Sequence, residues 1–279
     1  MDAERATNWV QAERGRAAVI ALAEDLAAVD VTLLVFKGLH LSFCVAPSPD
    51  YRFARDADAL VLSGSFERAG ARIRALSRWH LDDTNVSAHW LTDRETGAHV
   101  DLHKRVLPPR FGSLGRDALR SHARVDRAAF GSRVLVPDTL DAAVFTVANY
   151  AKDSLGNFGS PNIRADLGLM ERFGGLEPRD LAARLAAYEL RRVGLLTFTH
   201  LAAEDRAWER YRDACAASAA EQLLAAAVSR TIVDFAGRSE RLSFLVVRLV
   251  GDTPGNVLSS GSLAVARFVR DFMRLRGLA

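Results

Sequence analysis

Two acidic residues with a spacing suited to chemistry, Asp56 and Asp58, stand in the segment DADALVL, residues 56–62. The apolar residues that follow predict a strand, and side chains two positions apart on a strand point to the same face. Two carboxylates held side by side repel each other unless a positive group lies between them. The pair therefore indicates a site that holds a cation.

A third carboxylate occurs in the segment HVDLHKRV, residues 99–106. If residues 98–106 are extended, His99, Asp101 and His103 share one face, and the apolar residues between them pack into the core. Should this strand lie beside residues 56–62, Asp101 would join Asp56 and Asp58 in one cluster. Sites rich in carboxylate oxygen favour Mg²⁺ or Mn²⁺. We therefore predict that the three aspartates are metal ligands and catalytic residues.

Divalent ions and clustered carboxylates suit phosphoryl or nucleotidyl transfer, whose phosphates need donors of their own. Lys37 and Gly38 follow the apolar run VTLLVF, residues 31–36, and precede a short helical segment. Glycine permits a close backbone approach there, and lysine adds a mobile charge. Arg52 and Arg55 precede the aspartates and are expected to clamp phosphate oxygens.

Other interpretations of these residues stay open. A lone Asp-x-Asp is common in turns and on surfaces, and a lysine at the end of a strand is often solvated. His103 is able to bind Asp101, to bind substrate, or to act as an ordinary polar residue on a sheet edge. His99, Asp101 and His103 also suit a zinc site, although the spacing provides no third nitrogen or sulfur ligand.

The elements that position these residues predict an α+β fold. Residues 1–136 read as a small mixed sheet with helices. The strands are expected over residues 31–36, 56–62 and 132–137 and in a hairpin within residues 87–106, and helices over residues 16–29 and from the Ser65 cap onward. Residues 137–279 show helical spacing throughout, which predicts a helical domain that ends with the segment 261–277.

The composition of the chain limits the functional classes. It has 279 residues, 49% of them hydrophobic, a net charge of +3 and two cysteines, Cys44 and Cys215. These values favour a globular cytoplasmic protein without a disulfide framework, a thiolate zinc site or a membrane span. The mild positive charge is compatible with phosphate binding, whereas nucleic-acid binding would need a concentrated basic patch.

The segment FKGLHLSFCVAPSPDYRFARDADALV, residues 36–61, together with HVDLHKRV, resembles the uncharacterised nucleotidyltransferase family of the DNA polymerase β-like superfamily. The resemblance covers roughly residues 31–170 and includes an acidic position at Asp166. It implies that Asp56 and Asp58 are metal ligands and that Asp101 is a further ligand or the base for an acceptor hydroxyl. Leu39, Lys104 and Asn149 depart from the family pattern, which leaves the carboxylates intact and changes the handling of the substrate.

The expected function is Mg²⁺-dependent transfer of a nucleoside monophosphate from an NTP, such as ATP, to an acceptor hydroxyl. The acceptor is a small metabolite, an antibiotic, a peptide, a protein or a tRNA. Two alternatives remain. One is a degenerate module of the same fold that binds nucleotide or protein without turnover. The other is a metal-dependent phosphohydrolase that uses Asp101 and His103.

Overall fold

The computed structural model describes residues 3–52, 54, 56–108, 111–153, 155–156, 162–236, 247, 250 and 252. Arg55, predicted as a phosphate contact, and most of the segment 237–279, including the helix expected over 261–277, lie outside the described residues. The chain forms two compact units, each assembled from separate stretches of sequence. The domain boundary expected after residue 136 stays a prediction.

The first unit comprises Met1–Val106, Gly115–Ala142 and Asp166–Leu176. Its described residues form a seven-stranded sheet with the order β3-β4-β5-β2-β1-β7-β6. The strands are β1 (Thr32–Phe36), β2 (Ala57–Ser63), β3 (Trp79–Thr84), β4 (Ala88–Asp93), β5 (His99–His103), β6 (Arg124–Val125) and β7 (Val134–Val136). The sheet is mixed, because β2 pairs in parallel with β5 and antiparallel with β1.

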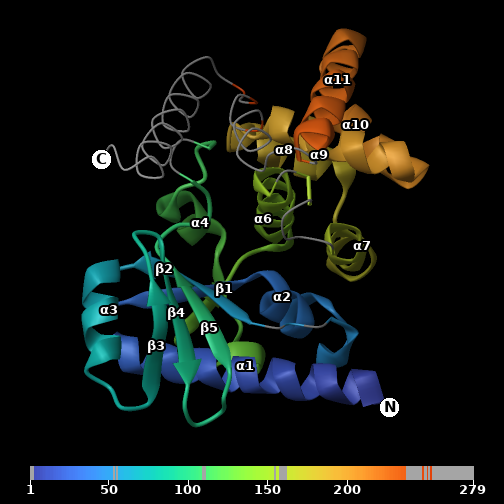
Figure 1. The fold of residues 1–279 in the computed structure, drawn as a ribbon. Coiled ribbons are helices and arrows are strands. Elements are labelled where there is room, and N and C mark those ends of the chain that lie inside the picture. The colour runs from blue at the N-terminus through green and yellow to red at the C-terminus, as the bar shows by residue number, and fades with distance from the viewer. Residues whose placement is uncertain are drawn as a thin grey trace. The chain divides into compact units, whose positions relative to one another are not determined.

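The longest helix of this unit, α1 (Ala3–Ala27), packs against one face of the sheet (Figure 1). Val19, Leu22 and Leu26 of α1 share a buried core with apolar side chains of β1, β2 and β5. The helix begins 13 positions before the expected start at Arg16, because residues 3–15 are rich in helix formers whose outer face stays in solvent. This core fixes which face of each strand is left for polar side chains.

Short helical segments connect the strands. They are α2 (Lys37–His40), the π-helical turn η1 (Leu41–Val45), the 3₁₀ turn η2 (Pro49–Tyr51), α3 (Phe66–Arg74), α4 (Arg116–His122) and α5 (Arg127–Phe130). The predicted cap of α3 is confirmed, since the Ser65 hydroxyl accepts a hydrogen bond from the backbone N–H of Arg68.

The C-terminal part of the described chain is helical, so the α+β class is confirmed. Its helices are α6 (Thr139–Lys152), α7 (Ile163–Gly174), α8 (Pro178–Ala187), α9 (Arg191–Glu204), η3 (Arg206–Trp208), α10 (Glu209–Cys215) and α11 (Ala219–Ala236). Within the second unit, Phe198 of α9 stacks on Tyr211 of α10 with ring centroids 5.0 Å apart. Among the described helices, none is both long and apolar enough to cross a membrane.

Candidate active site

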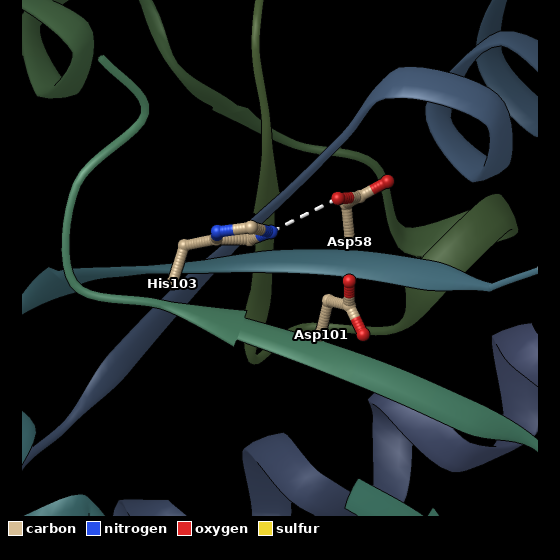
Figure 2. Close-up of side chains that lie close together, drawn as sticks. All are labelled: Asp58, Asp101 and His103. Atoms are coloured by element: carbon tan, nitrogen blue, oxygen red, sulfur yellow. Dashed lines mark hydrogen bonds and ion pairs between the residues drawn. The ribbon is translucent and has the colours of Figure 1, made fainter. Parts of the chain in front are cut away.

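The parallel pairing of β2 with β5 brings two of the predicted carboxylates together. In this register, Asp58 of β2 lies directly opposite Asp101 of β5. His103 follows on the same face of β5. One ligand atom from each of the three side chains lies within 4.8 Å of the others, and Figure 2 shows the side chains projecting from the same side of the two strands. The expectation that the strand of Asp101 lies beside that of Asp58 is confirmed.

The sequence places the polar group on this face because the alternate positions are apolar. Ala57 and Ala59 of β2, with Val100 and Leu102 of β5, are buried in the core that contains α1. The intervening residues must therefore point to the opposite face. Strand alternation thus determines which face of the sheet carries the cluster. The register of β2 with β5 determines which residues belong to it.

Asp58 is buried and holds two polar partners. Its Oδ1 accepts a hydrogen bond from Lys37 Nζ at 2.6 Å and lies 3.0 Å from His103 Nε2. Burial alone would raise the pKa of this carboxyl, but Lys37 and His103 outweigh it and lower the pKa to about 2. Asp58 is therefore a carboxylate at any physiological pH. Its positive partner in the structure is Lys37, a residue of the same chain.

Asp101 has a different environment, and its charged form is disfavoured. Burial, followed by the neighbouring charges of Asp58 and Asp56, raises the pKa of Asp101 to about 6. A carboxyl of this kind is largely ionised at neutral pH and still accepts a proton readily. This property suits a general base as well as a metal ligand.

Lys37 occupies the junction between β1 and α2 with an unusual backbone conformation. Its φ is +55°, a left-handed value that is uncommon for a residue other than glycine. Burial opposes its charge, but Asp58, Asp56 and Asp101 outweigh burial and hold the pKa of Lys37 above its usual range. The backbone conformation therefore directs a permanent cation at the cluster.

Asp56 precedes β2 and lies outside the group of three converging side chains. It is exposed and lines a small polar pocket together with Gln11 and His99. Its charge still reaches the cluster, since it acts on both Lys37 and Asp101. Its role as a metal ligand stays a prediction.

Arg52 pairs with Asp166 of α7, the acidic position noted in the sequence. Arg52 Nε lies 2.6 Å from Asp166 Oδ1, and Nη2 lies 3.2 Å from Oδ2. The Ser42 hydroxyl donates to the carbonyls of Gly38 and Arg52, which ties α2 to the loop before β2. Arg52 and Asp166 lie 114 positions apart in the sequence, and no local sequence pattern predicts that they pair.

Phe36 is a neighbour of the cluster that the sequence did not single out. It lies opposite Asp58 in the antiparallel pairing of β1 with β2. Its ring packs edge-on against His103, with centroids 5.5 Å apart, and Lys37 Nζ lies 5.4 Å from the ring centroid. Phe36 therefore supports both polar partners of Asp58. In the sequence it is only the last apolar residue of a strand.

A family model described as "Uncharacterised nucleotidyltransferase" matches residues 1–204. The chain belongs to this nucleotidyltransferase family. No curated protein matches the chain. The match contains the whole candidate cluster and both residues of the Arg52–Asp166 pair, while α10 and α11 lie beyond it.

The donor set of this family member fits a divalent cation. Two carboxylates, one of them ionised at any physiological pH, converge with an imidazole nitrogen. Membership in the nucleotidyltransferase family implies an NTP as substrate. Carboxylate oxygens are the ligands that Mg²⁺ and Mn²⁺ prefer, and a histidine is also accepted by Mn²⁺. The cluster is thus a candidate metal site in the same unit as the candidate phosphate contacts.

Proposed function

We propose that the protein is a metal-dependent nucleotidyltransferase that transfers a nucleoside monophosphate from an NTP to an acceptor hydroxyl. The observation that carries the proposal is the parallel register of β2 and β5, which sets Asp58 opposite Asp101. Family membership supports the reaction class. The acceptor is proposed only as a class, namely a hydroxyl-bearing small molecule, peptide, protein or tRNA.

In this proposal Asp58 and Asp101 hold Mg²⁺ or Mn²⁺, with Asp56 as a further ligand and His103 orienting Asp58. The bound ion would offset the negative charge of the phosphates and lower the pKa of an attacking hydroxyl. Asp101 has a second property that the reaction needs. Without a bound ion, burial and the charges of Asp58 and Asp56 raise the pKa of Asp101 to about 6. Where Asp101 serves as the base and not as a metal ligand, it would take the proton of the acceptor hydroxyl as the new P–O bond forms.

The residues around the loop before β2 bind the triphosphate. Lys37 supplies a flexible ammonium group, and the backbone of Gly38 beside it is the proposed phosphate contact. Arg52 is held in place by Asp166, so its guanidinium is oriented before substrate arrives. Arg55 stays a predicted phosphate contact. Pyrophosphate would leave as the acceptor oxygen attacks the α-phosphorus in line.

The test is a transfer assay with each of the four NTPs, labelled on the α-phosphate, in Mg²⁺ or Mn²⁺. Pools of small molecules, peptides, proteins and tRNA serve as acceptors, and the protein itself is examined for self-labelling. We expect pyrophosphate release coupled to labelling, which Asp58→Asn abolishes and Asp101→Asn slows about 100-fold or more.

A matched control is Asp82→Asn, which changes a partly exposed aspartate on β3 of the same sheet and should leave the rate unchanged. Two results would contradict the proposal. Nucleotide binding without pyrophosphate release would favour a degenerate binding module. The existing pairing of Asp58 with Lys37 and His103 would then explain that result. Release of inorganic phosphate without transfer would favour a phosphohydrolase.

A further inference from the structure

The metal-ligand candidate Asp58 carries a cation of its own chain. Lys37 Nζ lies 2.6 Å from Asp58 Oδ1, and the same oxygen lies 3.0 Å from His103 Nε2. The Asp58 side chain is only 6% exposed, whereas the Lys37 side chain is 33% exposed. The buried carboxylate is thus fixed, and its ammonium partner has access to solvent.

An ammonium group and a divalent ion cannot share this carboxylate without repulsion. Both would lie within a few ångströms of the same buried group, where the effective dielectric constant is well below that of water. Loss of the ammonium alone would leave Asp58 with His103 as its remaining polar side-chain partner among the described residues, which disfavours the charged carboxylate. The ammonium group of Lys37 and the divalent ion are therefore alternative partners of the Asp58 carboxylate.

We propose that Lys37 is an internal counterion that competes with the divalent cation for Asp58 and turns to the nucleotide phosphates when that cation binds. Only the second half of this statement rests on the proposed function. The competition itself requires a divalent cation at the cluster and nothing else.

The position of Lys37 allows this exchange. Its flexible four-carbon stem lets the ammonium group move while the backbone at the start of α2 stays in place. The ring of Phe36 lies close to Lys37 Nζ and is buried. The aliphatic part of the Lys37 side chain therefore has a fixed surface beside it while the ammonium group moves. Because the triphosphate removes the competing ammonium, nucleotide and metal must each increase the affinity for the other.

The test measures the affinity of the full chain for Mn²⁺ alone at neutral pH, by calorimetry and by the electron paramagnetic resonance signal of free Mn²⁺. Lys37→Met removes the charge and keeps most of the stem. Lys37→Asn provides a second neutral variant that tolerates the left-handed backbone. Both should bind Mn²⁺ about tenfold more tightly than the wild type, equivalent to about 1.4 kcal/mol. Lys37→Arg keeps the charge and should show no such gain.

The affinity for preformed Mn²⁺–ATP should change in the opposite direction. The neutral variants lose a phosphate contact, so we expect weaker binding of the complex together with tighter binding of Mn²⁺ alone. A purely structural defect would weaken both. The matched control is Arg78→Met, which removes a cation from Asp93, a fully buried carboxylate outside the cluster. It should leave the Mn²⁺ affinity unchanged.

The outcomes separate this inference from the proposed function. If the folded neutral variants bind Mn²⁺ no more tightly than the wild type, the competition is disproved, and Asp58-dependent transfer by the wild type would still stand. If they bind Mn²⁺ more tightly while no nucleotide is transferred, the competition stands and the transferase proposal fails. Absence of Mn²⁺ binding in every form would reject the metal site on which both depend.

Discussion

His40 is a fully buried titratable residue within α2, the helix that begins at Lys37. Its Nδ1 has no hydrogen-bond partner among the described residues, and its ring donates to the carbonyl of Pro137. Burial, aided by the charge of Arg124, lowers the pKa of His40 to about 4, although Asp126 and Asp138 oppose this shift. The neutral imidazole is therefore the form that the fold accepts.

This burial predicts a dependence of stability on pH. The unfolded imidazole has its ordinary pKa near 6.5, so between pH 6.5 and about 4 the unfolded chain binds more protons than the folded one. The contribution of His40 is therefore complete above pH 6.5 and is lost as the pH falls through this window, by up to about 3 kcal/mol. His40→Gln keeps a donor for Pro137 and does not titrate. As the pH falls from 6.5 to about 4, the unfolding free energy of this variant should therefore fall less steeply than that of the wild type.

Urea denaturation at a series of pH values measures this slope. The control is His80→Gln, which replaces an exposed imidazole on β3 and should keep the slope of the wild type. Equal slopes for His40→Gln and the wild type would show that the buried imidazole is not the group responsible.

At the level of elements, α2 and the loop before β2 form one packed unit around Gly38. A Cβ atom built on Gly38 would lie 3.2 Å from the Cβ of Ala54 and 3.9 Å from Cζ of Arg52. The glycine thus serves the close approach of two chain segments, which adds a structural reason to the phosphate role predicted for it. This contact fixes the loop that leads to Asp56 and Asp58.

Gly38→Ala should therefore push the loop outward. We expect a loss of about 1–3 kcal/mol in the free energy of unfolding and a severalfold weaker affinity for Mn²⁺, because the start of β2 shifts with the loop. Gly168→Ala on α7 is the matched control. Its new Cβ would meet no atom within 4 Å, so the helix should gain up to about 1 kcal/mol. Thermal unfolding and Mn²⁺ titration of both variants decide whether crowding at Gly38 matters.

The sequence predicted the elements whose pattern is local and missed what depends on distant partners. Strand alternation with apolar neighbours identified β2 and β5 and the shared direction of Asp58 and Asp101. β3 was not predicted, because four of its six residues are His80, Asp82, Asp83 and Thr84, which give no apolar alternation at this edge of the sheet. Lys37 with Asp58 and Arg52 with Asp166 could not be foreseen, since both pairs exist only once the register and the helix packing are formed.

At the scale of the whole molecule, the candidate metal site and the helices beyond the family match, α10 and α11, belong to different parts of the chain. Asp58, Asp101, His103 and Lys37 lie in the first unit, and the family match ends at residue 204, before α10. In the second unit, α9 begins after Leu190, which offers no side-chain cap. Asp252 supplies one from a distant point in the chain. Its carboxylate accepts the backbone N–H groups of Arg191 and Arg192 at 2.6 and 2.7 Å.

Asp252→Ala should therefore destabilise the start of α9, because two backbone donors lose their acceptor near the positive end of the helix dipole. We expect a loss of about 1 kcal/mol, as for other N-caps, and faster hydrogen exchange at the amides of Arg191 and Arg192. Asp252→Asn keeps a carbonyl acceptor and should lose less. The Mn²⁺ affinity should not change, because its candidate ligands all lie in the other unit. A change in Mn²⁺ affinity as large as that of Gly38→Ala would instead show that the segment containing Asp252 acts on the metal site. Unchanged hydrogen exchange at the amides of Arg191 and Arg192 would contradict the capping role.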